Sequence, residues 1–139
     1  DPRDVVLSCF RRRFKMNPAM YQLLSLSGAA EFYDAVLGLA WQARDTLGLA
    51  WHEVRHEAVV KDFERATRAI CDFLQVEWVQ GLEDFAGRVQ RREHSTPSTA
   101  QLARGLNASG IGHWRHYRAA LEAVQPVLGP WVERLGVEG

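Results

Sequence analysis

The sequence predicts a mainly α-helical fold with a single β-strand, in one domain over residues 1–139 that we expect to be incomplete. Apolar residues recur at three- and four-residue steps along most of the chain, which is the pattern of helices with one buried face. Only residues 49–57 alternate apolar and polar side chains, which is the pattern of a strand. The apolar content of 47% is sufficient for a packed core.

The first helix is expected from Asp1 to about Arg13, because Asp1 can cap it and Pro2 suits the first turn. Its basic end, Arg11–Arg13 followed by Lys15, complements the helix dipole. An anion-binding role for the same cations is equally open. The chain has no initial Met and enters structure at once, so we expect a piece of a longer protein.

A long helix is predicted from a cap at Ser27 to Leu47, with Gly48 ending it. Another helix is expected from a cap at Asp62 to Leu74, and a further one over residues 79–91. Residues 92–101 are rich in Ser, Thr and Pro and predict a loop.

Two glycines, Gly110 and Gly112, precede a predicted helix that carries Trp114, Tyr117 and Leu121. A last helix is expected to start near residue 126. The helical spacing of Trp114 and Tyr117 places both in the core rather than at a ligand.

The predicted strand contains the letters HEVRH, residues 52–56, which match the zinc-protease pattern H-E-x-x-H. On a helix, His52 and His56 would share a face and could hold one zinc ion. On a strand, residues four apart lie roughly 13 Å from each other, so they cannot share an ion. We therefore expect no metal, and a zinc protease stays a minor alternative.

A lone strand needs partners for its backbone donors and acceptors. We therefore expect either contact with a missing N-terminal half or self-association through the exposed strand edge. The formal net charge of zero gives the chain no general attraction for nucleic acid or an anionic membrane. No apolar run is long enough to cross a bilayer, and Cys9 and Cys71 lie far apart, which is typical of reduced cytoplasmic thiols. We expect a cytoplasmic protein with no nucleic-acid or membrane partner.

Four segments together resemble the C-terminal half of a cytosolic-type sulfotransferase, most closely the bacterial enzymes linked to tetratricopeptide repeats. They are DPRDVVLSCFRRRF, WHEVRHEAVVKDFE, STPSTAQLARGLNASGIGHWRHY and LGPWVERLGV. The resemblance implies the C-terminal part of a P-loop-like α/β fold that lacks its N-terminal nucleotide loop. It also implies transfer of a sulfuryl group from PAPS (phosphoadenylyl sulfate) to an acceptor hydroxyl or amine.

The resemblance places PAPS against three of the segments. It implies that Ser8 and Arg12, one helical turn apart, bind the ribose phosphate, as an arginine fork can do. His56 stands where the family usually has a Tyr on the adenine side, although a structural histidine is the more common role for such a residue. The polar candidates in the third segment are Ser98, Arg104 and His113. His113 replaces the family's usual Arg or Lys, which weakens anion binding at neutral pH.

Two parts of the family's site are missing from the sequence: the Arg expected before Asp1, and a Gly-rich loop for the reacting phosphate. No catalytic residue is therefore assigned, and the acceptor is not identified. We expect no turnover and weak or no PAPS binding by this chain alone. The alternatives are a noncatalytic helical interaction module and a nucleic-acid surface built on Arg11–Arg13, Arg88, Arg91 and Arg92.

Overall fold

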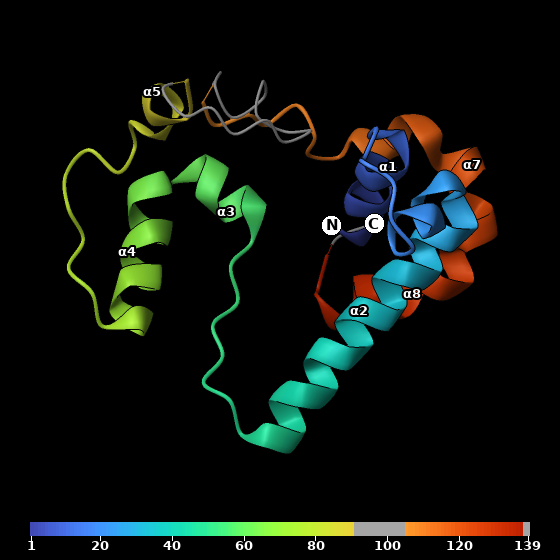
Figure 1. Ribbon diagram of the computed structural model, residues 1–139, viewed down its shortest axis with the longest axis horizontal. Coiled ribbons are helices and arrows are strands. Elements are labelled where there is room, and N and C mark those ends of the chain that lie inside the picture. Colours follow the sequence, from blue (N-terminus) through green and yellow to red (C-terminus); the bar gives the residue numbers. More distant parts are fainter. Residues whose placement is uncertain (91–104, 138–139) are drawn as a thin grey trace. The chain divides into compact units, whose positions relative to one another are not determined.

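The computed structural model describes residues 1–90 and 105–137, with only the backbone of residues 88–90 (Figure 1). All regular elements in these two ranges are helices, and η marks a 3₁₀ helix. In chain order they are α1 (Pro2–Arg11), η1 (Met20–Leu24), α2 (Leu26–Leu47), α3 (His56–Lys61), α4 (Phe63–Leu74), α5 (Phe85–Gln90), η2 (His113–Tyr117), α7 (Arg118–Leu121), η3 (Glu122–Val124) and α8 (Gln125–Arg134).

The prediction of a single β-strand is wrong. Residues 49–55 have no regular structure, and His56 is the first residue of α3. An extended segment becomes a strand only when a neighbouring strand pairs with its backbone, and residues 1–90 and 105–137 offer none. The expected part of a P-loop-like α/β fold is therefore not found either. Self-association stays a prediction, but the strand edge proposed for it does not occur in the described residues.

The chain forms two compact units. Unit 1 comprises Asp1–Ala50 and Ser109–Gly139, and unit 2 comprises Trp51–Ala108. Each unit is described by itself.

Unit 1 begins with α1, whose N-cap is Asp1 as the sequence predicts. The Asp1 carboxylate accepts a hydrogen bond from the backbone N–H of Arg3 at 2.9 Å and pairs with the Arg3 guanidinium at 2.7 Å. The predicted end at Arg13 is two residues too far, because the backbone is already extended at Arg12.

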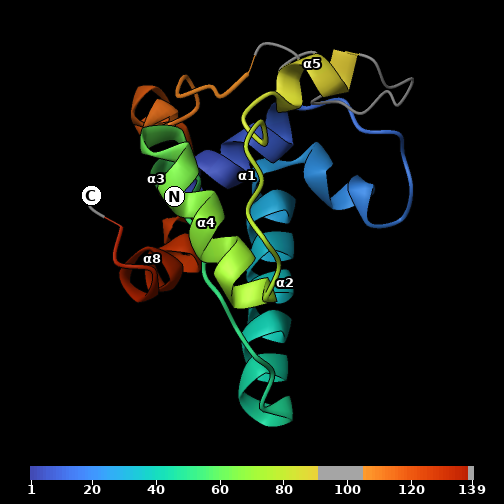
Figure 2. The ribbon, with the colours of Figure 1, turned by 90° about the vertical axis from the view of Figure 1, so that its left-hand side faces the viewer.

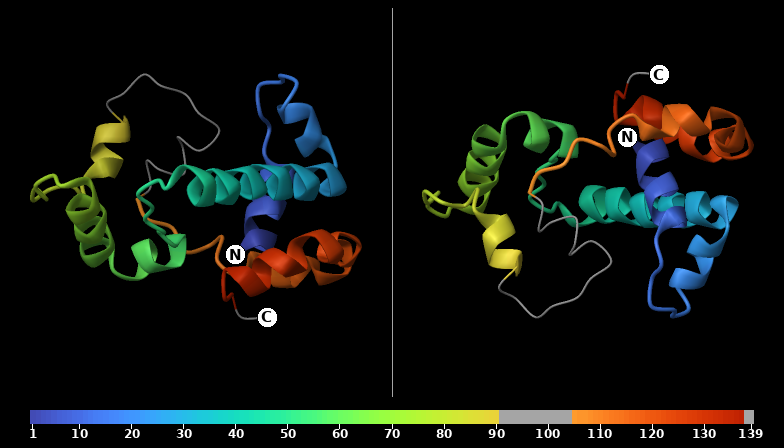
Figure 3. Two further views of the ribbon diagram at one scale, coloured as in Figure 1. Left: turned by 90° about the horizontal axis from the view of Figure 1, so that it is seen from below. Right: turned by 90° about the horizontal axis from the view of Figure 1, so that it is seen from above.

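Helix α2 is the long helix that the sequence predicts. Its N-cap is Ser25 rather than Ser27, and the Ser25 hydroxyl accepts the Gly28 N–H at 3.0 Å. It ends at Gly48, where the left-handed backbone (φ 59°) suits a residue without a side chain. Figure 3 shows α1 lying across the first half of α2, and in Figure 2 the second half extends beyond the helices that cover the first.

The hydrophobic core of unit 1 joins α1, η1, α2, η2, α7, η3 and α8. Its buried members are Val6, Leu7, Leu23, Ala29, Ala30, Trp114, Leu121, Val124 and Leu128. Leu128 is fully buried, with 0% of its surface exposed. Trp131 of α8 is also buried, and its indole N–H donates to the Asp34 carboxylate of α2 at 2.7 Å. The predicted helix after Gly112 is broken into η2, α7 and η3, which share this core.

Unit 2 is organised around α4. Asp62 caps it, as predicted, and accepts the backbone N–H of Arg65 at 3.1 Å. The Trp78 indole N–H donates to the Thr67 hydroxyl at 3.0 Å, and Phe63 stacks on Phe85 with ring centroids 5.8 Å apart. The helix predicted over residues 79–91 is much shorter, because only α5 forms there. No described residue of unit 2 is buried.

Both cysteines are free thiols. Burial raises the pKa of Cys9 in α1. Among the described helices, none combines the length and the apolar content needed to cross a bilayer.

Candidate functional site

The carboxylate of Asp4 fastens the start of η2 to α1. One oxygen accepts the backbone N–H of Gly112 and the other accepts that of Trp114, each at 2.7 Å. Charge-assisted hydrogen bonds of this length are strong, and Gly112 adopts the left-handed backbone (φ 69°) that the turn requires. Asp4 therefore fixes two segments that lie more than a hundred residues apart in sequence.

Trp114, whose backbone N–H is bound by Asp4, is the buried side chain of the same junction. It is 6% exposed, which confirms its predicted place in the core. The Arg3 guanidinium lies 3.6 Å from its ring centroid, a cation–π contact between the two segments. Burial lowers the pKa of Arg3, the negative charge of Asp4 raises it, and Asp1 provides the ion-pair partner. Two buried side chains in contact, Arg3 and Trp114, therefore form the base of the junction.

A second contact joins the two helices. Arg11 of α1 contacts His113 of η2, with Nη1 and Nε2 2.7 Å apart. A guanidinium can only donate hydrogen bonds, so Nε2 must accept, and the imidazole is neutral with its proton on Nδ1. Tyr117 lies beside both, with its ring centroid 5.4 Å from the His113 ring and 5.4 Å from the Arg11 guanidinium carbon. We call Ser8, Arg11, Arg12, His113 and Tyr117 the α1–η2 site.

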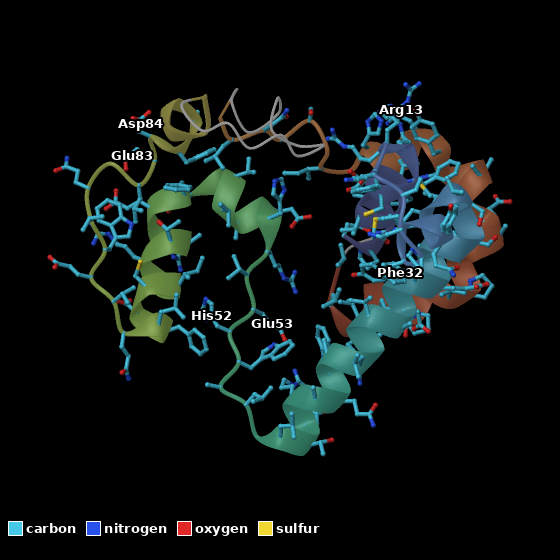
Figure 4. The ribbon with its side chains drawn as sticks, viewed as in Figure 1. Arg13, Phe32, His52, Glu53, Glu83 and Asp84 are labelled. Atoms are coloured by element: carbon cyan, nitrogen blue, oxygen red, sulfur yellow. The ribbon has the colours of Figure 1, made fainter. Side chains whose placement is uncertain are left out.

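Positive charge gathers around the α1–η2 site. The cations are Arg11, Arg12, Arg13 and Lys15 at and after the end of α1, and Arg115 and Arg118 on η2 and α7. In Figure 4 the Arg13 side chain reaches outward from unit 1. Guanidinium groups bind phosphate and sulfate through paired hydrogen bonds, so this end of unit 1 is suited to an anionic ligand.

The structure brings together only some of the predicted site residues. Ser8 is exposed on α1, one turn before Arg11. Arg12 is the residue after α1, and its backbone N–H donates to the Cys9 carbonyl at 3.2 Å. His113 is the predicted site residue of η2 that reaches α1, through its contact with Arg11.

The other predicted residues lie elsewhere. His56 belongs to unit 2, where its exposed side chain is on the first residue of α3. Ser98 and Arg104 lie outside the described residues.

Sequence reasoning missed Asp4, named Arg11 only as one cation of the basic helix end, and assigned Tyr117 to the core. Arg11 stands three residues after Ser8, a helical neighbour as close as Arg12, and this spacing was the available signal. Tyr117 was expected in the core but is 36% exposed. Nothing local to Asp4 indicated that its carboxylate would bind the distant Gly112.

The HEVRH pattern does not form a zinc site of the protease kind. Figure 4 shows His52 and Glu53 on the extended segment before α3, so the two histidines do not share a helical face. His52 stacks on Phe73, with ring centroids 5.3 Å apart. In the part of the chain that the structure describes, no three His, Cys, Asp or Glu side chains are grouped to hold a metal ion.

A hollow of about 520 Å³ lies on unit 2. It is lined by Phe63, Glu64, Arg68, Trp78, Gln80 and Glu83. The Arg68 guanidinium occupies the face of Trp78 at 4.0 Å and is paired with Glu64 at 2.7 Å. These side chains satisfy one another, so the hollow offers less to a ligand than the α1–η2 site does.

Comparison with known proteins gives one match. A family model described as the sulfotransferase family matches residues 1–80. Neither the curated proteins nor the solved structures contain a match to the chain. The matched range includes α1 with Ser8 and Arg11, whereas His113 lies beyond it.

Proposed function

The chain belongs to the sulfotransferase family, and from this premise we propose that its α1–η2 site binds the ribose phosphate of PAPS. In the reaction that the sequence resemblance implies, a sulfuryl group passes from PAPS to an acceptor hydroxyl or amine. Under this proposal the chain's own residues bind and orient the nucleotide. None of them is assigned as nucleophile or general base.

One observation carries the proposal: the Asp4 carboxylate joins α1 to η2 through two hydrogen bonds of 2.7 Å. The sequence resemblance assigns nucleotide contacts independently to both of these segments. By helical spacing, Ser8 shares one face of α1 with Asp4 and Arg11, which both contact η2. A phosphate there would meet a hydroxyl, guanidinium groups and an imidazole within about one helical turn.

The roles of the remaining candidates rest on the resemblance alone. We propose that His56 lies against the adenine, where a flat imidazole can stack on a purine. Ser98 and Arg104, which lie outside the described residues, are also proposed to contact PAPS. Binding by this chain is expected to be weak, so the test must detect millimolar dissociation constants.

The test is a titration with adenosine 3′,5′-bisphosphate, the nucleotide left after sulfuryl transfer, followed by NMR. Ser8→Ala removes one hydrogen bond to a charged group, worth about 1.5–3 kcal/mol, so binding should weaken roughly tenfold or more. Ser27→Ala is the matched control, because Ser27 is an exposed serine on α2. Saturable binding that Ser8→Ala leaves unchanged would refute the proposed phosphate contact.

A noncatalytic interaction module is a second candidate, and exposed apolar side chains on α2 favour it. Val36, Leu39 and Leu47 are 48%, 68% and 66% exposed. Such a stripe along one helix is typical of a protein contact. Sedimentation of the chain over a range of concentrations tests this: Leu39→Glu should abolish any association, whereas Glu31→Gln on the same helix should not.

A further inference from the structure

We propose that nucleotide binding at the α1–η2 site is coupled to the uptake of one proton by His113, so that affinity rises as the pH falls. This inference deepens the function proposed above and rests on it. It starts from the contact between Arg11 and His113.

The contact with Arg11 determines which nitrogen of the His113 ring carries the proton when no ligand is bound. Arg11 Nη1 lies 2.7 Å from His113 Nε2, and the guanidinium has no lone pair to offer. Nε2 must therefore be unprotonated while the contact exists. In this contact the His113 ring carries no charge. Its Nε2 accepts from the Arg11 guanidinium, which could instead donate to a bound anion.

The charged and titratable groups near His113 come from three elements. On η2, the rings of His116 and Tyr117 lie 5.6 Å and 5.4 Å from the His113 ring, and Arg115 lies over the neighbouring Trp114 ring. Arg118 of α7 lies over the same Trp114 ring, Arg11 of α1 contacts His113 directly, and Asp4 of α1 accepts the Trp114 backbone N–H. Asp4 is the acidic group in this set, and both its oxygens already accept backbone N–H groups. A second positive charge beside Arg11 would therefore be repelled.

A bound phosphate reverses this balance. The Arg11 N–H groups that now point to the imidazole turn to the phosphate oxygens, which leaves Nε2 without a donor. Nε2 then takes a proton from solvent and becomes a second donor to the same phosphate, as a charged imidazole can. No other bond is made or broken, and the net change is one proton bound with the nucleotide.

The coupling predicts how steeply the dissociation constant of the nucleotide changes with pH. If one proton is taken up, the dissociation constant falls by up to about tenfold for each pH unit lowered within the range where histidine titrates. The rise in affinity stops near about pH 6, because the phosphate itself takes up a proton there.

The experiment measures the dissociation constant of adenosine 3′,5′-bisphosphate for the full 139-residue chain at about pH 6.5, 7.5 and 8.5. The wild-type chain should bind severalfold more tightly at each lower pH. His113→Gln should bind without this gain, because the glutamine oxygen can accept from Arg11 but does not titrate. His52→Gln, which removes an exposed imidazole of unit 2, is the matched control, and it should keep the wild-type slope.

A second readout needs no nucleotide. The nitrogen shifts of the His113 ring in the free chain should report a proton on Nδ1, and Arg11→Met should remove that preference. A proton on Nε2, a wild-type affinity that does not change with pH, or a slope that survives in His113→Gln would each overturn the inference. Absence of nucleotide binding at every pH would instead refute the proposed function together with this coupling, so the two failures can be told apart.

Discussion

Unit 1 and unit 2 differ in what holds them together. Among the described residues, every buried apolar side chain belongs to unit 1, whereas unit 2 contains none. The α1–η2 site stands directly on the unit 1 core, because buried Trp114 and buried Arg3 form its base. Precise placement of ligand-binding groups requires such rigid support, so unit 1 is the part suited to hold a phosphate.

The arginines of the two units show the same difference. In unit 2, Arg68 is neutralised by Glu64, four residues earlier on the same helix, at 2.7 Å. In unit 1, the Arg11 side chain contacts a neutral imidazole across a distance of 102 residues in sequence. The charge of Arg68 is balanced by a carboxylate on the same helix. The contact that the structure gives Arg11 is with an imidazole, so no carboxylate in that contact competes with an anionic ligand.

The largest expected effect comes from removing core volume in unit 1. Leu128→Ala should lower the free energy of unfolding by about 2–5 kcal/mol, because Leu128 is completely buried and a cavity would remain. Phe73→Ala in unit 2 should cost much less, since Phe73 is 39% exposed. Urea unfolding followed by circular dichroism compares them. Equal losses would break the distinction between the units.

Asp4→Asn should have the next largest effect. The amide can accept only through one oxygen, so one of the two N–H groups of Gly112 and Trp114 loses its partner. The expected loss of stability is about 1.5–3 kcal/mol, together with weaker nucleotide binding. Asp72→Asn on exposed α4 is the control and should change neither. An Asp4→Asn chain with wild-type stability and affinity for the nucleotide would show that the two Asp4 hydrogen bonds are not needed to form the α1–η2 site.

A smaller effect concerns the thiol of Cys9. Burial raises its pKa, so at mildly alkaline pH less of it is thiolate in the folded chain than in the unfolded chain. In a Cys71→Ser background, the midpoint of its reaction rate against pH should lie higher in buffer than in urea. Because the folded chain holds this proton more tightly, the corresponding stability is present at low pH and is lost as the pH rises. Equal midpoints would contradict the packing of Cys9 against the core.

The smallest effect is expected in unit 2. Glu64→Gln breaks the i,i+4 pair with Arg68, whose side chains are 60% and 50% exposed respectively. The cost should be below about 0.5 kcal/mol, because water screens such pairs. A loss above about 1 kcal/mol, measured by urea unfolding, would mean that unit 2 depends on this pair more than its exposure suggests.

Local signals in the sequence were sufficient for three of the helix ends. Asp1, Gly48 and Asp62 act at the positions where the sequence places a cap or a stop, since each works through a backbone group within four residues. The long apolar repeat of α2 likewise identified that helix. The prediction failed at residues 49–57, because alternation there matched a strand although strand formation depends on a partner elsewhere.

The site was only partly accessible from sequence for the same reason. Ser8 and His113 were named through a resemblance, but the hydrogen bonds that join their two helices, α1 and η2, come from Asp4. A carboxylate that binds backbone N–H groups leaves no pattern in the sequence of its partner. Arg11 was named only as one of the cations at the helix end, because its contact with His113 is equally long-range.

The most direct test of the central claim is a map of backbone amide shifts as adenosine 3′,5′-bisphosphate is added to the wild-type chain. We expect the amides around Ser8 and Arg11 on α1 and those of Gly112 and His113 on η2 to move together, with one dissociation constant. Movement confined to one of these segments, or to unit 2 alone, would contradict a single phosphate site built by α1 and η2.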